Sequence, residues 1–426
     1  MNSAFSVSKV TFAPVSASLK EVNFAIVPVL LSLAAGAQAE SLSLAAALRE
    51  ALATHPLLDV VSAGIDAAEG QIRQSATRPN PLFIYQSENL RAWQSPAYRY
   101  WQDSDHFFYL QQTFETASKR ARRQDVARTV RDRIQLEREM TAWQIAARVR
   151  AAYWDAAATA RVAALYRQVG ENYRETVAYH ETRFREGAIA ESDLIRVQLE
   201  ASRLALSANS AVLDAEQARI RLQREMGRRE FVELELSDAL EGPPATPPAS
   251  LEAAFRQRPE MKLALKIGEL AGVRIQLQQA LATPNVDGVF GYKRSNGFDT
   301  LLWGVQVPLP VFNRNAGNIE SAVAEQRAAA SAIRSTEALI AAEYEAVRRE
   351  LTLREIQLQQ AATPLLNRAR ENARVAEAAY RLGGTDILRL LDAQRQQLDA
   401  ERLFIDAAAG LRQARAHLDS VLGVMP

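Results

Sequence analysis

Residues 381–394 read Arg-Leu-Gly-Gly-Thr-Asp-Ile-Leu-Arg-Leu-Leu-Asp-Ala-Gln, and this stretch decides how the chain folds. One long helical pattern of apolar residues runs into it, and a second one runs out of it. Gly383 and Gly384 can adopt the left-handed backbone that ends a helix. Thr385 or Asp386 can then cap the next helix. The stretch therefore predicts the turn at the tip of a long helical hairpin.

The same device occurs 196 residues earlier, at Gly187. This glycine ends a long helical run, and Ser192 or Asp193 is placed to cap the helix that follows. Gln198 lies 11 residues past Gly187, just as Gln394 lies 11 residues past Gly383. The chain therefore carries two helical hairpins with matched tips.

The internal repeat extends beyond the tips. Helical patterns at residues 42–74 and 250–279 both have Ser-Leu near their start and a proline 16 residues before an isoleucine. A turn and two β-like segments follow each pattern, at residues 82–87 and 106–114 in the first repeat and at 289–293 and 301–312 in the second. In the last segment Leu301, Trp303, Val305 and Val307 alternate with other residues, which predicts a strand with one more apolar face. The repeat covers nearly the whole mature chain.

Long helices are predicted after the strands, at residues 116–183 and 317–381, and each would be roughly 100 Å long. The second has an apolar stripe with coiled-coil periodicity, which comprises Ile319, Val323, Ala330, Ile333, Ile340, Tyr344, Val347 and Leu351. Gly170 and Pro364 predict a kink or break in each helix near its tip. Helices at residues 191–227 and 385–422 return from the tips, and Gly227 and Gly423 end them.

Four segments follow from this pattern. Residues 1–39 are predicted to be an export signal, because Lys9 and Lys20 precede an apolar stretch and Ala37-Gln38-Ala39 is a small-x-small cleavage site. An N-terminal anchor helix is the alternative. Residues 40–227 form the first repeat, residues 228–249 a proline-rich linker in extended conformation outside the coil, and residues 250–426 the second repeat.

Composition restricts the function. The net charge of +1 argues against a nucleic-acid binder. The chain has no cysteine, so it forms no disulfide and cannot carry a lipid on an N-terminal cysteine. After residue 39 there is no run of about 18 apolar residues, so a membrane crossing would have to use strands. Four strands cannot close a membrane barrel, which needs at least about eight. Two chains would supply eight strands, and three chains would supply twelve.

Two segments resemble a known family. Residues 307–319 read Val-Pro-Leu-Pro-Val-Phe-Asn-Arg-Asn-Ala-Gly-Asn-Ile, and their first-repeat counterpart, residues 112–120, reads Gln-Thr-Phe-Glu-Thr-Ala-Ser-Lys-Arg. Together with the repeat, these segments resemble the TolC-like outer-membrane efflux proteins, and in particular their heavy-metal, CzcC-like branch.

The resemblance implies a mainly α fold with a small β part. It implies a homotrimer with a twelve-strand β-barrel in the lipid of a Gram-negative outer membrane, a periplasmic α-helical tunnel, and the linker in the equatorial region. Such a trimer is a passive exit duct for heavy-metal cations of the cobalt, zinc and cadmium type. It works with an inner-membrane RND pump through a periplasmic adaptor protein.

The resemblance also implies two groups of site residues. The periplasmic gate would comprise Asp392, Arg389, Asp193 and Arg196. Arg389 stands where the family has a second aspartate, so it would pair with Asp392 or with a neighbouring protomer, and the gate is either acidic or charge-paired. The adaptor would dock at the tips, at Gly187, Gly383, Gly384, Thr385 and Asp386. The alternative is that the charges are solvated helix charges and that the tips are only turns.

No enzyme or metal centre is expected. Neither a phosphate-binding glycine loop, a nucleophile elbow nor a pair of metal ligands at helical spacing occurs, so no cofactor is predicted. His180 beside Glu181 is the one candidate ligand pair, and a surface histidine is the preferred interpretation. The exported ion stays undetermined. A channel for drug efflux or type I protein secretion is one alternative function, and a soluble periplasmic coiled-coil adaptor is another.

Overall fold

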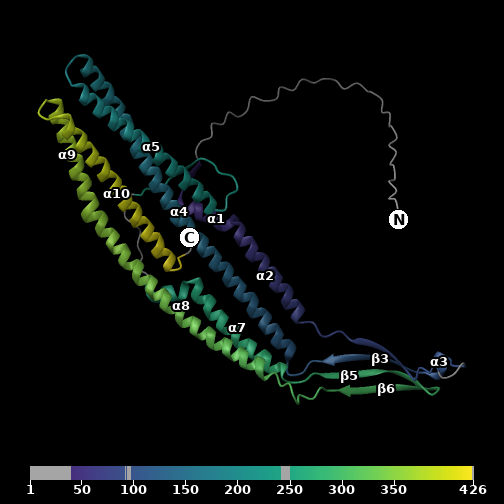
Figure 1. Ribbon diagram of the computed structural model, residues 1–426. Coiled ribbons are helices and arrows are strands. Elements are labelled where there is room, and N and C mark those ends of the chain that lie inside the picture. Colours follow the sequence, from purple (N-terminus) through teal and green to yellow (C-terminus); the bar gives the residue numbers. More distant parts are fainter. Residues whose placement is uncertain (1–39, 92, 94–96, 241–249, 425–426) are drawn as a thin grey trace, which may run out of the picture. The chain divides into compact units, whose positions relative to one another are not determined.

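The computed structural model describes residues 40–424 except 92, 94–96 and 241–249 (Figure 1). The expected export signal and the proline-rich part of the linker lie outside the described residues. The described residues are mainly helical and form two small sheets. The predicted fold class, mainly α with a small β part, is confirmed.

The first repeat has the predicted order of helix, two strands, long helix and returning helix. Its elements are β1 (Glu40–Leu42), α1 (Leu44–Thr54), α2 (Pro56–Ser75), β2 (Leu82–Glu88), α3 (Tyr100–Asp103), β3 (Asp105–Phe114), α4 (Lys119–Arg185) and α5 (Glu191–Glu225). Pro56 separates α1 from α2 because a proline has no N–H to continue the first helix. His55 caps α2, since its side chain accepts a hydrogen bond from the backbone N–H of Leu57.

The second repeat follows the same order. After β4 (Leu234–Leu236) in the linker, its elements are α6 (Leu251–Gln257), α7 (Pro259–Leu281), β5 (Val286–Ser295), β6 (Phe298–Gln306), α8 (Ala316–Ile356), the π-helix η1 (Gln357–Ala362), α9 (Thr363–Arg381) and α10 (Ile387–Val421). β6 was predicted to continue to Phe312, which is wrong. Pro308 and Pro310 follow it closely, and prolines cannot donate to a strand ladder.

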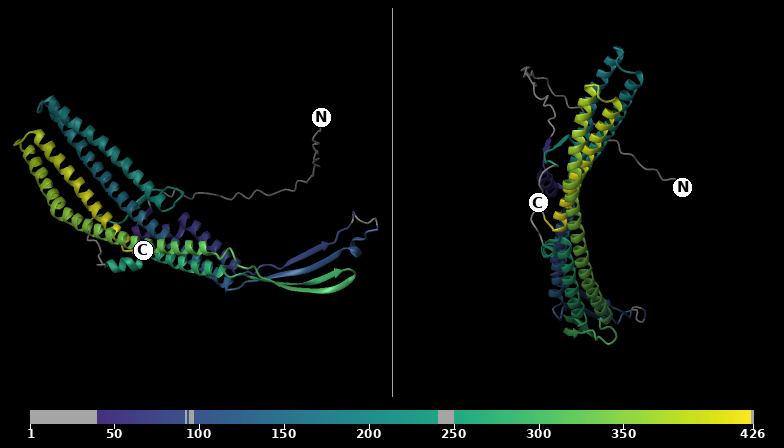
Figure 2. Two further views of the ribbon diagram at one scale, coloured as in Figure 1. Left: turned by 60° about the horizontal axis from the view of Figure 1, so that its bottom comes forward. Right: turned by 90° about the vertical axis from the view of Figure 1, so that its left-hand side faces the viewer.

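The four long strands form one antiparallel sheet in the order β2-β3-β5-β6. The central pairing, β3 with β5, joins the two repeats. Asn296 and Gly297 connect β5 to β6 with φ of 49° and 80°, which is the backbone of a two-residue hairpin turn. The sheet lies at one end of the helices, and the two hairpin tips lie at the other end (Figures 1 and 2).

The linker takes part in a second, two-stranded sheet. Its described part contains β4, which is extended and pairs in parallel with β1. Asp238 follows β4 and accepts hydrogen bonds from the backbone N–H of Leu44 at 2.6 Å and from the Tyr153 hydroxyl at 2.8 Å. These bonds fix the linker against α1 and α4.

Apolar clusters hold the helices together, and three of them are large. Tyr153 and Leu222 lie in the first, where α1, α4 and α5 meet. Ile340 and Val347 lie in its second-repeat counterpart, where α6, α8 and α10 meet. A third cluster joins the two hairpins towards the tips and comprises Leu165, Tyr173, Val197, Leu204, Ile387, Leu390, Leu391, Leu398 and Ile405.

Some sequence predictions about the long helices need correction. α4 continues through Gly170 without a break, because a glycine keeps its N–H and so keeps the helical hydrogen bond. The predicted irregularity at Pro364 is confirmed, because η1 lies directly before it. On α8, Ala330 is exposed, whereas Ala322 and Ala329, seven residues apart, are buried.

Candidate functional site

One face of the four-stranded sheet carries exposed apolar side chains in register. Phe83 lies opposite Leu110, Leu110 opposite Phe290, and Phe290 opposite Trp303. Their exposed fractions are 68, 52, 63 and 79%. The neighbouring row on the same face comprises Tyr85, Phe108, Tyr292 and Leu301. A continuous exposed apolar patch of this kind marks a site of contact with a membrane or with another protein.

Aromatic residues gather at the end of the sheet that lies away from the helices. Trp93 and Trp101 are 79 and 60% exposed. Beneath them His106 is buried, and its ring contacts those of Tyr100 and Trp101. His106 Nε2 lies 3.1 Å from the Tyr100 carbonyl oxygen, so the loop is folded back onto the strand.

The two segments that carry the family resemblance have related geometry. Each turns from a strand into a long helix through left-handed residues, with φ of 51° and 56° at Ala117 and Ser118 and 58° at Asn315. Lys119 is buried and donates to the Thr283 carbonyl and to the Asn285 side chain of the other repeat. The resembling segments therefore join the sheet to the helices and one repeat to the other.

The predicted tips have matched backbone geometry. Gly187 and Gly383 have φ of 71° and 73°. In each tip the residue after the glycine donates its N–H to a carbonyl five residues earlier, from Ala188 to Arg183 at 2.8 Å and from Gly384 to Ala379 at 2.8 Å. An added Cβ on Gly187 or Gly383 would meet nothing within 4 Å, so the backbone, not packing, requires the glycine. Only Gly383 of the Gly383-Gly384 pair is left-handed.

The helices that leave the tips are capped differently. Asp386 caps α10 as predicted, and its carboxylate accepts from the N–H of Arg389 at 3.0 Å. The predicted cap of α5 at Ser192 or Asp193 is wrong, because the helix begins after Ala190 without a side-chain cap. The Thr385 hydroxyl is buried and has no hydrogen-bond partner among the described residues.

The four predicted gate residues divide into a pair and two separate charges. Asp193 and Arg196 form an ion pair at 3.3 Å. Asp392 is exposed and accepts from Gln396 at 2.8 Å, whereas no ion pair joins it to Arg389 in the described part of the chain. Arg389 is also exposed. Within one chain, then, Asp392 is not neutralised by Arg389.

The sequence did not identify the polar contacts that join the two hairpins. Arg395 of α10 binds both carboxylate oxygens of Glu200 of α5, at 2.8 and 3.4 Å. Tyr173 lies beside this pair, and burial together with the Glu200 charge raises the pKa of Tyr173 to about 12. These two residues are 195 positions apart, so no local spacing in the sequence predicts their contact. When the two tips are aligned, however, Glu200 and Arg395 both lie about 12 residues past Gly187 and Gly383.

His180 is not the surface histidine that the sequence suggested, because it is 1% exposed. Its Nδ1 lies 2.7 Å from the Thr176 carbonyl oxygen, and its Nε2 lies 2.8 Å from the Tyr380 hydroxyl of the other hairpin. Glu181 accepts from Gln198 at 3.3 Å instead of joining His180. The two residues of the candidate ligand pair therefore make separate contacts.

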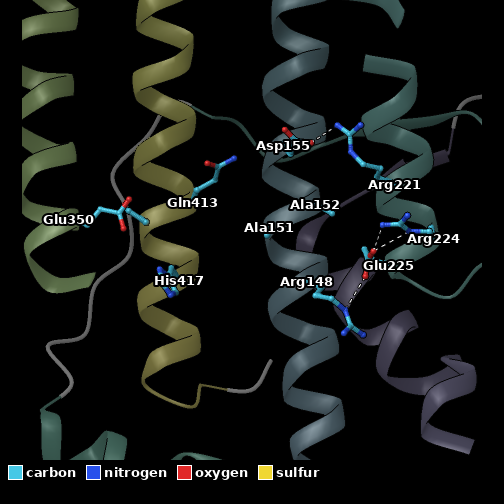
Figure 3. Close-up of a pocket in the computed structure, with 11 residues that line it drawn as sticks. Arg148, Ala151, Ala152, Asp155, Arg221, Arg224, Glu225, Glu350, Gln413 and His417 are labelled. Atoms are coloured by element: carbon cyan, nitrogen blue, oxygen red, sulfur yellow. Dashed lines mark hydrogen bonds and ion pairs between the residues drawn. The ribbon is translucent and has the colours of Figure 1, made fainter. Parts of the chain in front are cut away.

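A cleft of about 560 Å³ lies between α4, α5, α8 and α10 (Figure 3). Its charges are paired on one side: Asp155 with Arg221 at 2.8 Å, and Glu225 with Arg148 at 3.0 Å. Exposed pairs of this kind contribute about 0–1 kcal/mol each. The charges on this side of the cleft are therefore largely paired with one another.

Two further properties bear on the site. Among the described residues, no cluster of three His, Asp or Glu side chains is arranged to hold a metal ion. None of the helices in the described part of the chain has an apolar run sufficient for a membrane span.

Comparison with known proteins agrees with this geometry. Residues 251–424 match the family model for outer membrane efflux proteins. No curated protein matches the chain significantly.

Several solved structures have a similar fold. One is a membrane protein from Pseudomonas aeruginosa, with a TM-score of 0.76 and 19% identity over 93% of this chain and 95% of that one. The outer membrane protein VceC of Vibrio cholerae gives 0.71 and 18%, over 89% of this chain and 96% of that one. The open state of the Neisseria gonorrhoeae MtrE outer membrane channel gives 0.72 and 19%, over 89 and 88%. The fold is that of the outer-membrane efflux channels, and the family match lies in its second repeat.

Proposed function

We propose that this chain is the outer-membrane channel of a tripartite efflux system and acts as a passive exit duct. The observation that carries the proposal is the apolar row Phe83, Leu110, Phe290 and Trp303, which crosses all four strands at the end of the molecule opposite the hairpin tips. An apolar band flanked by aromatic residues suits lipid, and long helices with charged surfaces suit the periplasm.

The functional unit in this proposal is a homotrimer in the outer membrane of a Gram-negative cell. Within one chain β2 and β6 are the edges of the sheet, and each has only one neighbouring strand. Edge strands expose unpaired backbone groups, which lipid cannot satisfy. Three chains would pair these edges with one another and bring twelve strands around one pore.

The tips face the partners. Gly187, Gly383, Gly384, Thr385 and Asp386 lie at the end away from the sheet, where a periplasmic adaptor can dock and connect the channel to an inner-membrane RND pump. Asp392, Arg389, Asp193 and Arg196 lie just beyond the tips, where they would line the constriction of the closed tunnel.

The cargo we propose is heavy-metal cations of the cobalt, zinc and cadmium type. The support is the sequence of residues 112–120 and 307–319, which resembles the heavy-metal branch. Because a wide hydrated tunnel does not need to coordinate its cargo, the absence of a three-ligand cluster in the described residues is compatible with this proposal. Selectivity would then reside in the pump.

Deleting the gene and measuring growth tests this proposal. We expect the deletion strain to lose resistance to zinc, cobalt or cadmium and to keep its resistance to drugs, and a plasmid copy should restore it. Loss of drug resistance alone would contradict the proposed metal cargo, but it would still agree with an efflux channel. Recovery of the protein in the soluble periplasmic fraction would contradict the channel itself and favour a soluble adaptor.

A further inference from the structure

The segment that leads from β6 to α8 exposes apolar side chains although it is not a strand. Residues 307–312 read Val-Pro-Leu-Pro-Val-Phe and lie where the sheet meets the helices (Figure 1). Leu309, Val311 and Phe312 are 79, 62 and 101% exposed, so the Phe312 ring is not covered by its own chain at all. A group of uncovered apolar side chains of this kind marks an interaction surface.

The corresponding segment of the first repeat is held against the protein instead. There the Thr116 hydroxyl donates to the Pro284 carbonyl at 2.5 Å, and the buried Lys119 donates to the Thr283 carbonyl. Among the described residues, no hydrogen bond joins residues 309–312 to a strand or a helix. The two repeats therefore differ at this point, and the second one leaves its apolar side chains free for another partner.

The backbone of this segment presents few free hydrogen-bond donors. Pro308 and Pro310 have no N–H, and the N–H of Val311 donates to the Leu309 carbonyl at 2.8 Å. The two prolines also restrict the backbone, which favours the exposed conformation without supporting contacts. Because an unpaired N–H is costly in hydrocarbon, such a segment enters the edge of a bilayer at a lower cost than an ordinary loop.

A cation lies beside these apolar side chains. Arg314 is exposed, and its Nε donates to the Pro310 carbonyl at 3.2 Å, which keeps the guanidinium next to the segment. No carboxylate forms an ion pair with Arg314 in the described part of the chain. A guanidinium binds phosphate well, because its planar fork matches two phosphate oxygens. Apolar side chains beside an unpaired guanidinium fit the boundary between the acyl chains and the headgroups of anionic phospholipids.

We propose that residues 307–312 are a lipid anchor, in which Leu309 and Phe312 enter the periplasmic leaflet of the outer membrane while Arg314 binds an anionic phospholipid headgroup. The anchor continues the apolar face of the sheet, since Trp303 and Val305 are exposed on one face of β6 directly before it. It would fix the level at which the helices leave the membrane. The choice of membrane and leaflet rests on the proposed function.

The test measures the depth of spin labels on the full-length protein in vesicles of phosphatidylethanolamine and phosphatidylglycerol. The chain has no cysteine, so Leu309→Cys and Phe312→Cys each carry a single label. Trp303→Cys gives the reference for lipid, and Glu320→Cys, at an exposed position of α8, gives the reference for water. We expect the labels at 309 and 312 to collide with oxygen more often than with a water-soluble nickel chelate, as at 303. The label at 320 should show the opposite ratio.

The outcomes separate the anchor from the proposed function. If the label at position 303 meets lipid and the labels at 309 and 312 meet water, the anchor is wrong and the proposed function stands. Labels at 309 and 312 that neither reagent reaches would overturn the anchor in favour of contact with a second copy of the chain. If the label at 303 also meets water, the proposed lipid-facing sheet fails together with the anchor.

The headgroup contact is tested separately with Arg314→Gln. Spin-labelled phosphatidylglycerol and phosphatidylcholine, each added to the vesicles at low salt, measure which lipid the protein holds at its surface. We expect the parent to prefer phosphatidylglycerol and Arg314→Gln to reduce this preference about fivefold, the effect of one cation near an anionic surface. Arg327→Gln, at an exposed arginine of α8 further from the sheet, should keep the parent's preference. A parent-like preference in Arg314→Gln would overturn the headgroup contact.

Discussion

His55 shows how one residue makes stability depend on pH. It caps α2 through Nδ1, which accepts from the Leu57 N–H at 3.2 Å and must therefore be unprotonated. Burial, with a contribution from the positive charge of Arg148, lowers the pKa of His55. The unfolded chain consequently binds the proton more readily than the folded one, so this stability is present above the ordinary histidine pKa and is lost as the pH falls.

We predict that His55→Asn flattens this part of the pH dependence. Asparagine is a good N-cap that does not titrate near neutral pH. Urea unfolding of the parent should show stability that falls between about pH 7 and pH 5, and the variant should lose less over the same range. A parent and a variant with parallel curves would show that His55 is not responsible.

Gly383 is the residue on which the second tip depends. Its φ of 73° is outside the range that proline can adopt, and its N–H donates to the Tyr380 carbonyl at 3.0 Å. We predict that Gly383→Pro abolishes efflux while the protein still reaches the membrane. Gly383→Asn is the matched control, since asparagine tolerates the left-handed region and keeps the N–H. If cells that carry Gly383→Pro are as resistant as the parent, this tip is not the surface at which the partner docks.

At the scale of elements, the sheet has two unlike faces. Trp303 belongs to the exposed apolar row, and its neighbour Gly304 points to the other face, where an added Cβ meets nothing within 4 Å. A lysine facing the middle of a bilayer costs about 2–4 kcal/mol.

We therefore predict that Trp303→Lys lowers the fraction of protein that inserts into lipid vesicles, and that Gly304→Lys inserts like the parent. Protease protection after mixing unfolded protein with vesicles measures that fraction. Equal insertion of the two variants would mean that the apolar face does not meet lipid.

The sequence predicted those elements whose signals are local. Paired glycine turns, heptad spacing and strand alternation placed the hairpins and three of the four long strands to within a few residues. The end of β6 was missed, although Pro308 and Pro310 should have set it. The β1–β4 pairing could not be foreseen, since three-residue strands nearly two hundred positions apart leave no local pattern. The break predicted at Gly170 was wrong because a glycine permits a break in a helix without causing one.

The candidate site was predicted less completely than the fold. The tips and the Asp386 cap were predicted from the residue types that turns and helix starts favour. The gate residues were predicted only from the family resemblance. The contacts between hairpins, Arg395 with Glu200 and His180 with Tyr380, depend on how two helices are rotated about their axes. The sequence alone does not give that rotation, because packing in the third apolar cluster determines it.

At the scale of the whole molecule, the gate depends on how three chains meet. Asp392 has no ion-pair partner in the described residues of its own chain, so three copies near one axis would form an acidic ring, with Arg389 one turn away. We predict that Asp392→Ala weakens the cation preference of the pore and that Arg389→Ala strengthens it. Asp399→Ala, an exposed acid about two turns further along α10, is the control. Reversal potentials in a salt gradient measure the preference, and unchanged values in both gate variants would place the constriction elsewhere.

The central claim is that this chain forms a passive pore across the outer membrane. The conductance of the purified full-length protein in a planar lipid bilayer tests it most directly. The account predicts discrete, uniform current steps without any added energy source, carried by a complex whose mass is that of three chains. Protein that is monomeric in mild detergent and leaves the bilayer current unchanged would contradict it.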